Sequence, residues 1–326
     1  MPLRLLLVGA FPYPHYQGSQ VYFREQAIAL RAAGAEVELL TYSTRAARAP
    51  GDLGFWRGLD GFEHWKTPPW TASRSLRSGP SWGKPIADLG IAMTLDDAIA
   101  SKMLRSESYD AILTHNAEAT LMALAARRLR HSNQTPIVYC VHTLLGNELS
   151  SYFKSLNYKN KMISSDSLDE RKPNRSSVLV RVINRLGDAL DRTLARRVDG
   201  WISLTRSSHR VMRRASIAPG AMIPPGLPDP RHQLEPLLPA SGSQRGRLPD
   251  KAFYLYSGNL DAYQEIELLR AAARGRGRDL PPIVVASHDR RVLESGRFGD
   301  SPITPLHVDS GDEMLALIAS ARATLV

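Results

Sequence analysis

Short apolar runs alternate with amphipathic segments through the first part of the chain. Residues 3–9 ("LRLLLVG") form a continuous apolar run, as expected of a strand covered on both faces. Residues 20–34 then show apolar side chains at helical spacing that end at Gly34, and residues 36–42 ("EVELLTY") predict a second strand. Because crossovers between parallel strands are right-handed, we expect a right-handed βαβ unit. The fold class we predict is therefore α/β.

The alternation continues and then starts again after a linker. The further elements predicted before the linker are strands over 109–115, 136–142 and 200–205 and helices near 86–105, 117–130 and 178–199. Those predicted after it are strands over 252–260, 282–287, 303–308 and 323–326 and helices near 263–274 and 311–321. We therefore expect a domain over 1–225 with elaborated loops at 43–85 and 146–176, a linker over 226–250, and a second parallel-sheet domain over 251–326.

Charge and cysteine content narrow the function classes. The chain has 326 residues and a net charge of +10, and residues 151–230 alone contribute +8. That stretch has no known nucleic-acid motif, so we do not expect nucleic-acid binding. The single cysteine, Cys140, cannot form an internal disulfide, which favours a reducing, cytoplasmic location.

Two further absences bear on location and cofactors. The apolar run at the N-terminus is short and lacks a small-residue cleavage site, and no stretch approaches the ~20 apolar residues of a spanning helix. The nine histidines are scattered without paired ligand spacing, so the sequence predicts no metal site.

The loop after the first predicted strand is a candidate anion site. Gly18 and Ser19 come directly before the predicted helix, and open α/β folds bind ligands at the carboxyl ends of their strands. A glycine permits close approach of a ligand to the backbone, and a helix N-terminus offers unpaired N–H groups to an anion. The loop matches neither GxGxxG nor a P-loop. A phosphate site and a plain turn with Ser19 as helix cap therefore both remain open.

Five segments in order resemble the retaining family-four glycosyltransferases of the GT-B fold. They are the opening βαβ unit, "YDAILTHN", "PIVYCVHT", "LARRVDGWISLTRSSHRVM" with "AMIPPGLPD", and "YLYSGNLDAYQEIELLRAA". The resemblance implies a GT-B-like fold with two Rossmann-like parallel-sheet lobes. It also implies transfer of a sugar from a nucleotide-diphosphate sugar to a carbohydrate or lipid-linked acceptor, with retention of configuration and without a further cofactor.

The resemblance assigns roles to individual residues. Gly18 and Ser19 would receive the diphosphate, and His142 matches the family histidine that faces the donor sugar. His115 and Asn116 end another predicted strand and would line the acceptor side. For each histidine, hydrogen bonding within its own neighbourhood remains the alternative to a functional role.

The chain departs from the family pattern in its second domain. The family offers Arg and Lys to the diphosphate, where Asn259 and Gln264 stand here, and neutral amides contribute less to a dianion than charged donors do. The family's Glu-x7-Glu motif would follow the strand that "ATLV" begins, so we expect an incomplete second lobe. The alternative function is a catalytically incompetent remnant that acts as a binding module.

The predicted helix near 178–199 is basic and amphipathic. Val182, Leu186, Leu190 and Leu194 fall on one stripe, and several arginines lie mostly off it. Such a helix most often packs its apolar stripe on a core and leaves its charges in water. The other hypothesis is contact of residues 151–200 with an anionic surface, such as the inner face of the cytoplasmic membrane.

Overall fold

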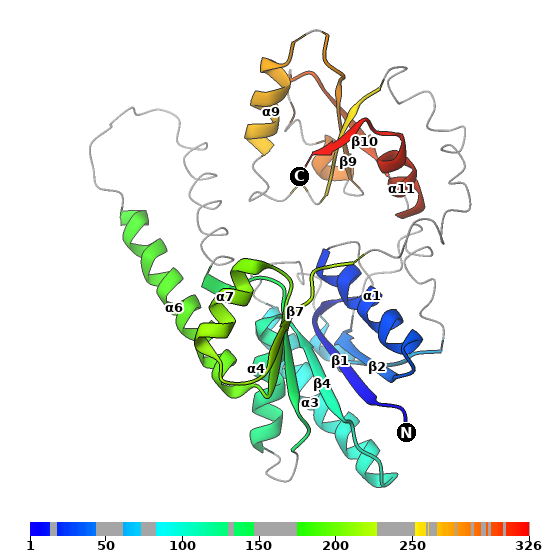
Figure 1. Cartoon of the computed structure of the whole chain (residues 1–326), viewed down its shortest axis with the longest axis vertical. Helices are drawn as coiled ribbons and strands as arrows, with labels where there is room; N and C mark the ends of the chain where they lie inside the picture. Colours follow the sequence, from blue (N-terminus) through cyan, green and yellow to red (C-terminus); the bar gives the residue numbers. More distant parts are fainter. Residues whose placement is uncertain are drawn as a thin grey trace. The chain divides into compact units, whose positions relative to one another are not determined.

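The computed structural model divides into two units, which are described separately (Figure 1). Residue contacts place the described residues up to 226 in the first unit and those from 252 on in the second. The residues that the structure describes are 1–13, 18–43, 61–72, 83–129, 134–146, 175–226, 252–258, 260, 266–277, 279–287, 290–294, 298, 301–308 and 311–325.

A parallel sheet of seven strands forms the centre of the first unit. Its strands are β1 (Arg4–Pro12), β2 (Glu36–Tyr42), β3 (Glu63–Lys66), β4 (Ala111–His115), β5 (Ile137–Val141), β6 (Gly200–Ser203) and β7 (Gly220–Met222). Their order in the sheet is β3-β2-β1-β4-β5-β6-β7. Leu6, Leu7 and Val8 of β1 are fully buried, because neighbouring strands and helices on both faces enclose this strand.

Helices cover both faces of this sheet. They are α1 (Gly18–Ala32), α3 (Lys84–Leu104), α4 (Asn116–Leu129), α6 (Arg175–Arg197) and α7 (Arg206–Ala215), with a short 3-10 turn η1 (Pro69–Thr71). The chain crosses the sheet in one direction from β1 to β2 and in the other from β4 to β5. Since both crossovers are right-handed, α1 and α4 lie on opposite faces. In α3, Ala87, Ile91 and Leu95 recur every four residues and are fully buried, as the helical spacing predicts.

The second unit repeats the α/β pattern on a smaller scale. Its four parallel strands are β8 (Tyr254–Ser257), β9 (Ile283–Ser287), β10 (Ile303–His307) and β11 (Ala323–Leu325), in the order β10-β9-β8-β11. Its helices are α9 (Ile266–Gly275), α10 (Arg290–Glu294) and α11 (Gly311–Ser320). The observed architecture confirms the predicted α/β class with two parallel sheets.

Some elements were not predicted. β3 ("EHWK") is a strand within the segment 43–85, for which the sequence predicts an irregular loop, because it has no apolar run and lies at the sheet edge. The helix α7 buries only Ser208 and Met212, so its sequence shows little apolar periodicity. β7 and α10 were also missed, and each is at most five residues long.

The expectation that the apolar stripe of α6 packs on the core is wrong for most of its described length. Val182, Leu186 and Leu190 are 46%, 59% and 41% exposed, whereas Leu194 is buried. The buried face of α6 instead passes through Gly187 and Asp191. A neighbouring face of the helix therefore packs against the unit, and the apolar stripe remains in contact with water.

Two glycines allow α6 to approach the segment that follows β5. A Cβ atom on Gly187 would lie 2.6 Å from both N and Cα of Gly146. The Asp191 carboxylate accepts a hydrogen bond of 3.3 Å from the Gly146 N–H in the same contact. The close approach therefore fixes the end of the segment that begins with His142.

We predict that Gly187→Ala lowers the free energy of unfolding by about 1–3 kcal/mol, because the new methyl group overlaps backbone atoms. Helix propensity alone would give the opposite sign, a gain of up to about 1 kcal/mol. Urea unfolding measures the difference. The matched control is Gly275→Ala in α9, where a Cβ meets no atom within 4 Å. A stabilised Gly187→Ala variant would contradict the packing.

Candidate functional site

The sheet of the first unit has one point at which its strand order reverses. β1 pairs with β2 on one side and with β4 on the other, and Gly9 lies opposite His115 in the β1–β4 register. The segments that leave the carboxyl ends of β1 and β4 diverge to opposite faces, so a crevice forms between them. Helices α1 and α4 follow these two strands (Figure 1). The switch point is thus where an open α/β fold binds its ligand.

Gly18 and Ser19 form the start of α1, beside this switch point. Gly18 is the first residue of the helix, and a Cβ atom added to it would meet nothing within 4 Å. Ser19 lies inside the first turn rather than at the cap position, with its Oγ 3.4 Å from Oε1 of Gln20. The first turn has no acidic residue. This helix N-terminus can therefore accept an anion without local repulsion or steric conflict.

Asn116 turns the chain from β4 into α4. Its φ is +76°, in the left-handed region, which asparagine tolerates better than most residues. Its carbonyl oxygen accepts a 2.9 Å hydrogen bond from Thr120, and Thr120 also lies 2.8 Å from Thr114. The sharp turn places the N-terminus of α4 at the carboxyl edge, near that of α1. A non-glycine residue with positive φ at such an edge is typical of functional sites.

His115 and His142 are joined by a hydrogen bond. His115 Nδ1 lies 2.8 Å from His142 Nε2. The neighbouring pairing of β4 with β5, in which His115 lies opposite Cys140, brings the two strand ends together. His115 is fully buried, whereas His142, just beyond β5, is partly accessible. The sequence placed both histidines at this edge, and the structure shows that they act as one pair.

Burial keeps both imidazoles neutral. It lowers the pKa of His142 to about 4, and it lowers the pKa of His115 well below its usual value, with a further contribution from His142. One ring of a neutral pair donates and the other accepts. In either arrangement the second nitrogen of His115, Nε2, is buried and has no hydrogen-bond partner among the described residues. This nitrogen is a polar group still to be satisfied.

Two aromatic side chains of α1 enclose the histidine pair. The Tyr22 ring packs edge-on against His142 with 5.1 Å between centroids, and Phe23 packs edge-on against His115 at 4.8 Å. Burial raises the pKa of Tyr22 to about 12, so its phenol stays protonated. The helix that begins at Gly18 thus also orients the histidines.

A second polar group at this edge was missed in the sequence. The Tyr42 hydroxyl at the end of β2 donates a hydrogen bond to Asp88, and Lys84 forms a 2.5 Å ion pair with Glu118 of α4. Burial and the nearby Glu118 raise the pKa of Asp88 to about 6, against the effects of Tyr42 and Lys84. Lys84 and Asp88 are four residues apart on α3, but such spacing is common on exposed helices and is not specific.

A lysine side chain, Lys66, lies at the carboxyl ends of β2 and β3. Lys66 donates hydrogen bonds of 2.9 Å to the carbonyl oxygen of Tyr13 and 2.8 Å to Oγ1 of Thr41. The Thr41 Oγ1 atom lies 2.9 Å from His64 Nε2, and burial lowers the pKa of His64 to about 3, with a smaller contribution from Lys66. This group fastens the segment that follows β1 and places positive charge near the crevice.

The described residues also bear on metal binding and on membrane-spanning helices. Asn259 and Gln264 lie outside the described residues. Within the described ranges, no group of three His, Cys, Asp or Glu side chains could hold a metal ion. None of the helices that the structure describes is long and apolar enough to cross a bilayer.

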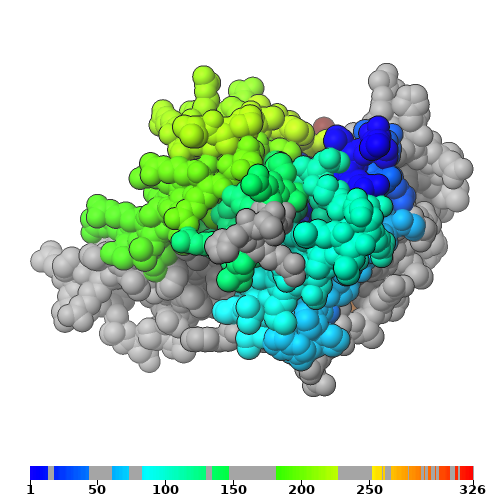
Figure 2. Space-filling view, turned by 90° about the horizontal axis from the view of Figure 1, so that it is seen from below, coloured from blue at the N-terminus to red at the C-terminus, as the bar shows by residue number. Residues whose placement is uncertain are grey.

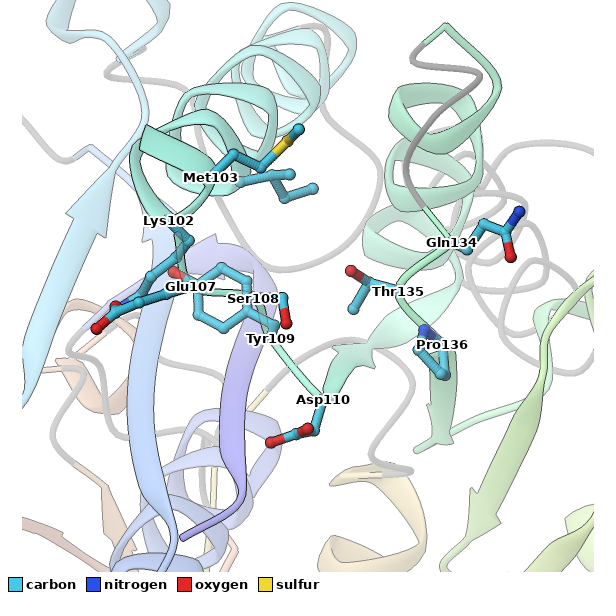
Figure 3. A pocket seen from close by; sticks show the side chains of 10 residues that line it. Lys102, Met103, Glu107, Ser108, Tyr109, Asp110, Gln134, Thr135 and Pro136 are labelled. Carbon is cyan, nitrogen blue, oxygen red and sulfur yellow. The ribbon is translucent and has the colours of Figure 1, made fainter. Parts of the chain in front are cut away.

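A separate pocket of about 420 Å³ lies at the opposite edge of the sheet (Figure 3). It is lined by residues that precede β4 and β5, among them Tyr109, Asp110 and Pro136. Asp110 accepts a 2.7 Å hydrogen bond from the Arg4 N–H, and Lys102 pairs with Glu38. Ligands of open α/β sheets bind at the carboxyl edge, so this pocket is not the candidate site.

We predict that stability falls on acidification because of the buried neutral histidines. A histidine whose folded pKa is about 4 binds fewer protons than the unfolded chain does between pH 6.5 and 4. The unfolded state is therefore favoured as the pH falls through this range. Urea unfolding of wild type and His142→Gln, which retains a polar group but cannot titrate, isolates the effect. Between pH 7 and 5 the wild type should lose about 2 kcal/mol more than the variant. Equal losses would show that His142 titrates normally.

Comparisons with known proteins agree with this geometry. A family model described as a glycosyl transferase 4-like domain matches residues 17–226. The catalytic domain of starch synthase IV from Arabidopsis thaliana, bound to ADP and acarbose, is similar with a TM-score of 0.61 at 12% identity, over 99% of this chain and 78% of that one. Sucrose-phosphate synthase from Thermosynechococcus elongatus gives 0.58 at 17% identity, over 99% and 74%.

An enzyme of another class is also similar. UDP-N-acetylglucosamine 2-epimerase from Rickettsia bellii gives a TM-score of 0.57 at 14% identity, over 99% of this chain and 74% of that one. Among curated proteins, none matches the chain. At such identities the structures show the fold alone, which confirms the predicted GT-B-like fold class with Rossmann-like lobes. Because the family model covers more than half of the sequence, this chain belongs to the glycosyl transferase 4-like family.

Proposed function

We propose that the protein transfers a sugar from a nucleotide-diphosphate sugar to a carbohydrate or lipid-linked acceptor. The observation that carries this proposal is the edge where α1 and α4 begin beside the neutral pair His115–His142. The departing group is a dianion, and preorganised donors at the point where charge develops lower the barrier to such a reaction. Membership of the glycosyl transferase 4-like family supports the same reaction class.

The diphosphate would bind at the N-terminus of α1. The N–H groups of the first turn, around Gly18 and Ser19, are the donors, and the open space next to Gly18 admits phosphate oxygens. The resemblance also assigns Asn259 and Gln264 to the diphosphate, as neutral donors. Lys66 contributes positive charge near this edge.

His142 would contact the donor sugar. Its Nε2 is hydrogen-bonded to His115. Its Nδ1 could therefore bind a sugar hydroxyl group, or lie beside the ring oxygen of the sugar in an oxocarbenium-like transition state. A neutral ring makes this contact without repelling developing positive charge. His115 is fully buried, and we therefore assign it a positioning role through His142.

The acceptor would bind on the side of Asn116, Asp88 and Glu118. The partly exposed carboxylates of Asp88 and Glu118 are suited to bind sugar hydroxyl groups, and the buried Tyr42 hydroxyl holds Asp88 in place. With a pKa of about 6, Asp88 is also poised to accept a proton near neutral pH. Retention of configuration rests on the motif resemblance alone, and NMR of the product's anomeric proton tests it.

A second candidate is a binding module that holds the nucleotide sugar without transfer. The uncharged residues Asn259 and Gln264, at positions where the resemblance implies Arg and Lys, favour it. Release of nucleoside diphosphate with UDP-, GDP- and ADP-sugars and a panel of acceptors distinguishes the two. Acceptor-dependent release is expected for the transferase. Binding without release would support the module, and formation of an epimerised sugar nucleotide would contradict both.

We predict that Gly18→Asp weakens nucleoside diphosphate binding at least about tenfold, because the new carboxylate repels the diphosphate at the N-terminus of α1. The same charge interacts favourably with the helix dipole, so thermal stability should be unchanged or slightly higher. Isothermal titration calorimetry with UDP, GDP and ADP measures the affinity. Gly18→Ala is the matched control and should bind normally, since its Cβ meets nothing within 4 Å. Equal affinity of both variants would place the diphosphate elsewhere.

A further inference from the structure

Helix α6 exposes an apolar stripe that the described residues of the first unit leave largely uncovered. Val182, Leu186 and Leu190 follow one another at intervals of four residues and are 46%, 59% and 41% exposed. A repeat of four places them on one side of the helix. The adjoining side packs against the unit through Gly187, Asp191 and Leu194. The stripe thus lies beside the packed side, on an anchored helix.

A row of arginines runs along this stripe. Arg181, Arg185, Arg192 and Arg196 are exposed, and their spacing of four, seven and four positions keeps them on one face of the helix. Each of Arg181 and Arg185 directly precedes a residue of the apolar stripe, Val182 or Leu186, in the sequence. Charged and apolar rows therefore lie side by side rather than on opposite faces.

The next helix extends the basic surface. α7 packs against α6, and Figure 2 shows the residues of α6, α7 and β7, in green, gathered on one side of the unit. α7 exposes Arg206, Arg210, Arg213 and Arg214, and Ile217 just after it is fully exposed. We call the exposed residues of α6 and α7, with Ile217, the α6–α7 face.

Few acidic groups offset this charge. Residues 175–226 contain ten Arg and no Lys, against three Asp and no Glu. Asp191 is buried, and Asp199 pairs with Arg127 and accepts a hydrogen bond from the Ile137 N–H. Only Asp188 remains as an exposed acid outside such a pair. Among the described residues of this stretch, arginines therefore far outnumber acidic groups, and the α6–α7 face formed by these residues carries a net positive charge.

We propose that the α6–α7 face binds the surface of an anionic lipid bilayer. The negative charge of the lipid headgroups complements the arginines. The apolar stripe of α6 can enter the boundary between headgroups and acyl chains beneath them. A nucleic acid would match the arginines but would leave Val182, Leu186 and Leu190 without an apolar partner, whereas an anionic bilayer supplies both kinds of contact. The sequence predicted contact of an anionic surface with residues 151–200. Of these, residues 151–174 lie outside the described residues, and the α6–α7 face also includes α7, beyond residue 200.

This inference goes beyond the proposed function and does not depend on it, because lipid binding needs neither donor nor acceptor. It bears on the acceptor class, since a protein held at a bilayer meets lipid-linked acceptors. The His115–His142 edge and the α6–α7 face belong to the same unit, and each can be altered without touching the other.

Co-sedimentation of the full chain with vesicles tests the proposal. Vesicles of phosphatidylcholine with roughly one-third phosphatidylglycerol should bind the protein at about 0.1 M salt, and pure phosphatidylcholine should not. Arg185→Gln/Arg192→Gln should lower the partition coefficient about tenfold or more, and about 1 M salt should do the same. Val182→Ser/Leu186→Ser should weaken binding to the anionic vesicles at either salt concentration, because it removes apolar contact.

The control variant is Leu104→Ser/Arg105→Gln, an adjacent apolar and basic pair exposed at the end of α3. It should bind vesicles like the wild type. Since all substituted side chains are exposed, thermal unfolding should show unchanged stability in each variant. Absence of binding to anionic vesicles overturns the proposal, as does binding that both α6 variants leave unchanged. Retention on a soluble polyanion without vesicle binding would instead identify an acidic macromolecule as the partner.

Discussion

The parallel pairing of β1 with β4 is the contact on which the candidate site depends. β1 is fully buried over Leu6, Leu7 and Val8, so it can occupy only the centre of the sheet. Its two neighbours in the sheet are β2, the next strand along the chain, and β4, which the chain reaches only after forming the edge strand β3. Right-handed crossovers then send α1 and α4 to opposite faces. The crevice between their N-termini follows from this one strand order.

The histidine pair is the chemical counterpart of that geometry. His115 and His142 meet because β4 and β5 are adjacent and end at the same level. Tyr22 and Phe23 pack against the two rings, and burial keeps both of them uncharged. Neutral rings can orient a sugar without competing with the helix N-termini for the diphosphate. Anion binding and sugar binding are thus assigned to different groups at one edge.

The sequence predicted more of the fold than of the site. Apolar runs and helical spacing predicted the strands and helices that pack in the core. They missed the edge strand β3, whose own polar side chain His64 contacts Thr41 of β2. Both histidines were predicted at the carboxyl edge, but their contact depends on strand register, which single-chain patterns do not specify. Asp88 was missed because Tyr42 and Glu118 approach it from other elements. The exposure of Leu186 likewise depends on which side of α6 packs, not on its periodicity.

Hydrogen–deuterium exchange of the full chain, with and without the nucleoside diphosphate that it binds best, shows where the diphosphate binds. We predict slower exchange at the carboxyl edge of the first sheet, in the amides of the first turn of α1 from Gly18 and around Asn116 and His142. Amides at the start of β4 and β5, beside the pocket that contains Tyr109 and Pro136, should exchange at the same rate in both samples. Protection at that opposite edge, with the helix N-termini unchanged, would contradict the account.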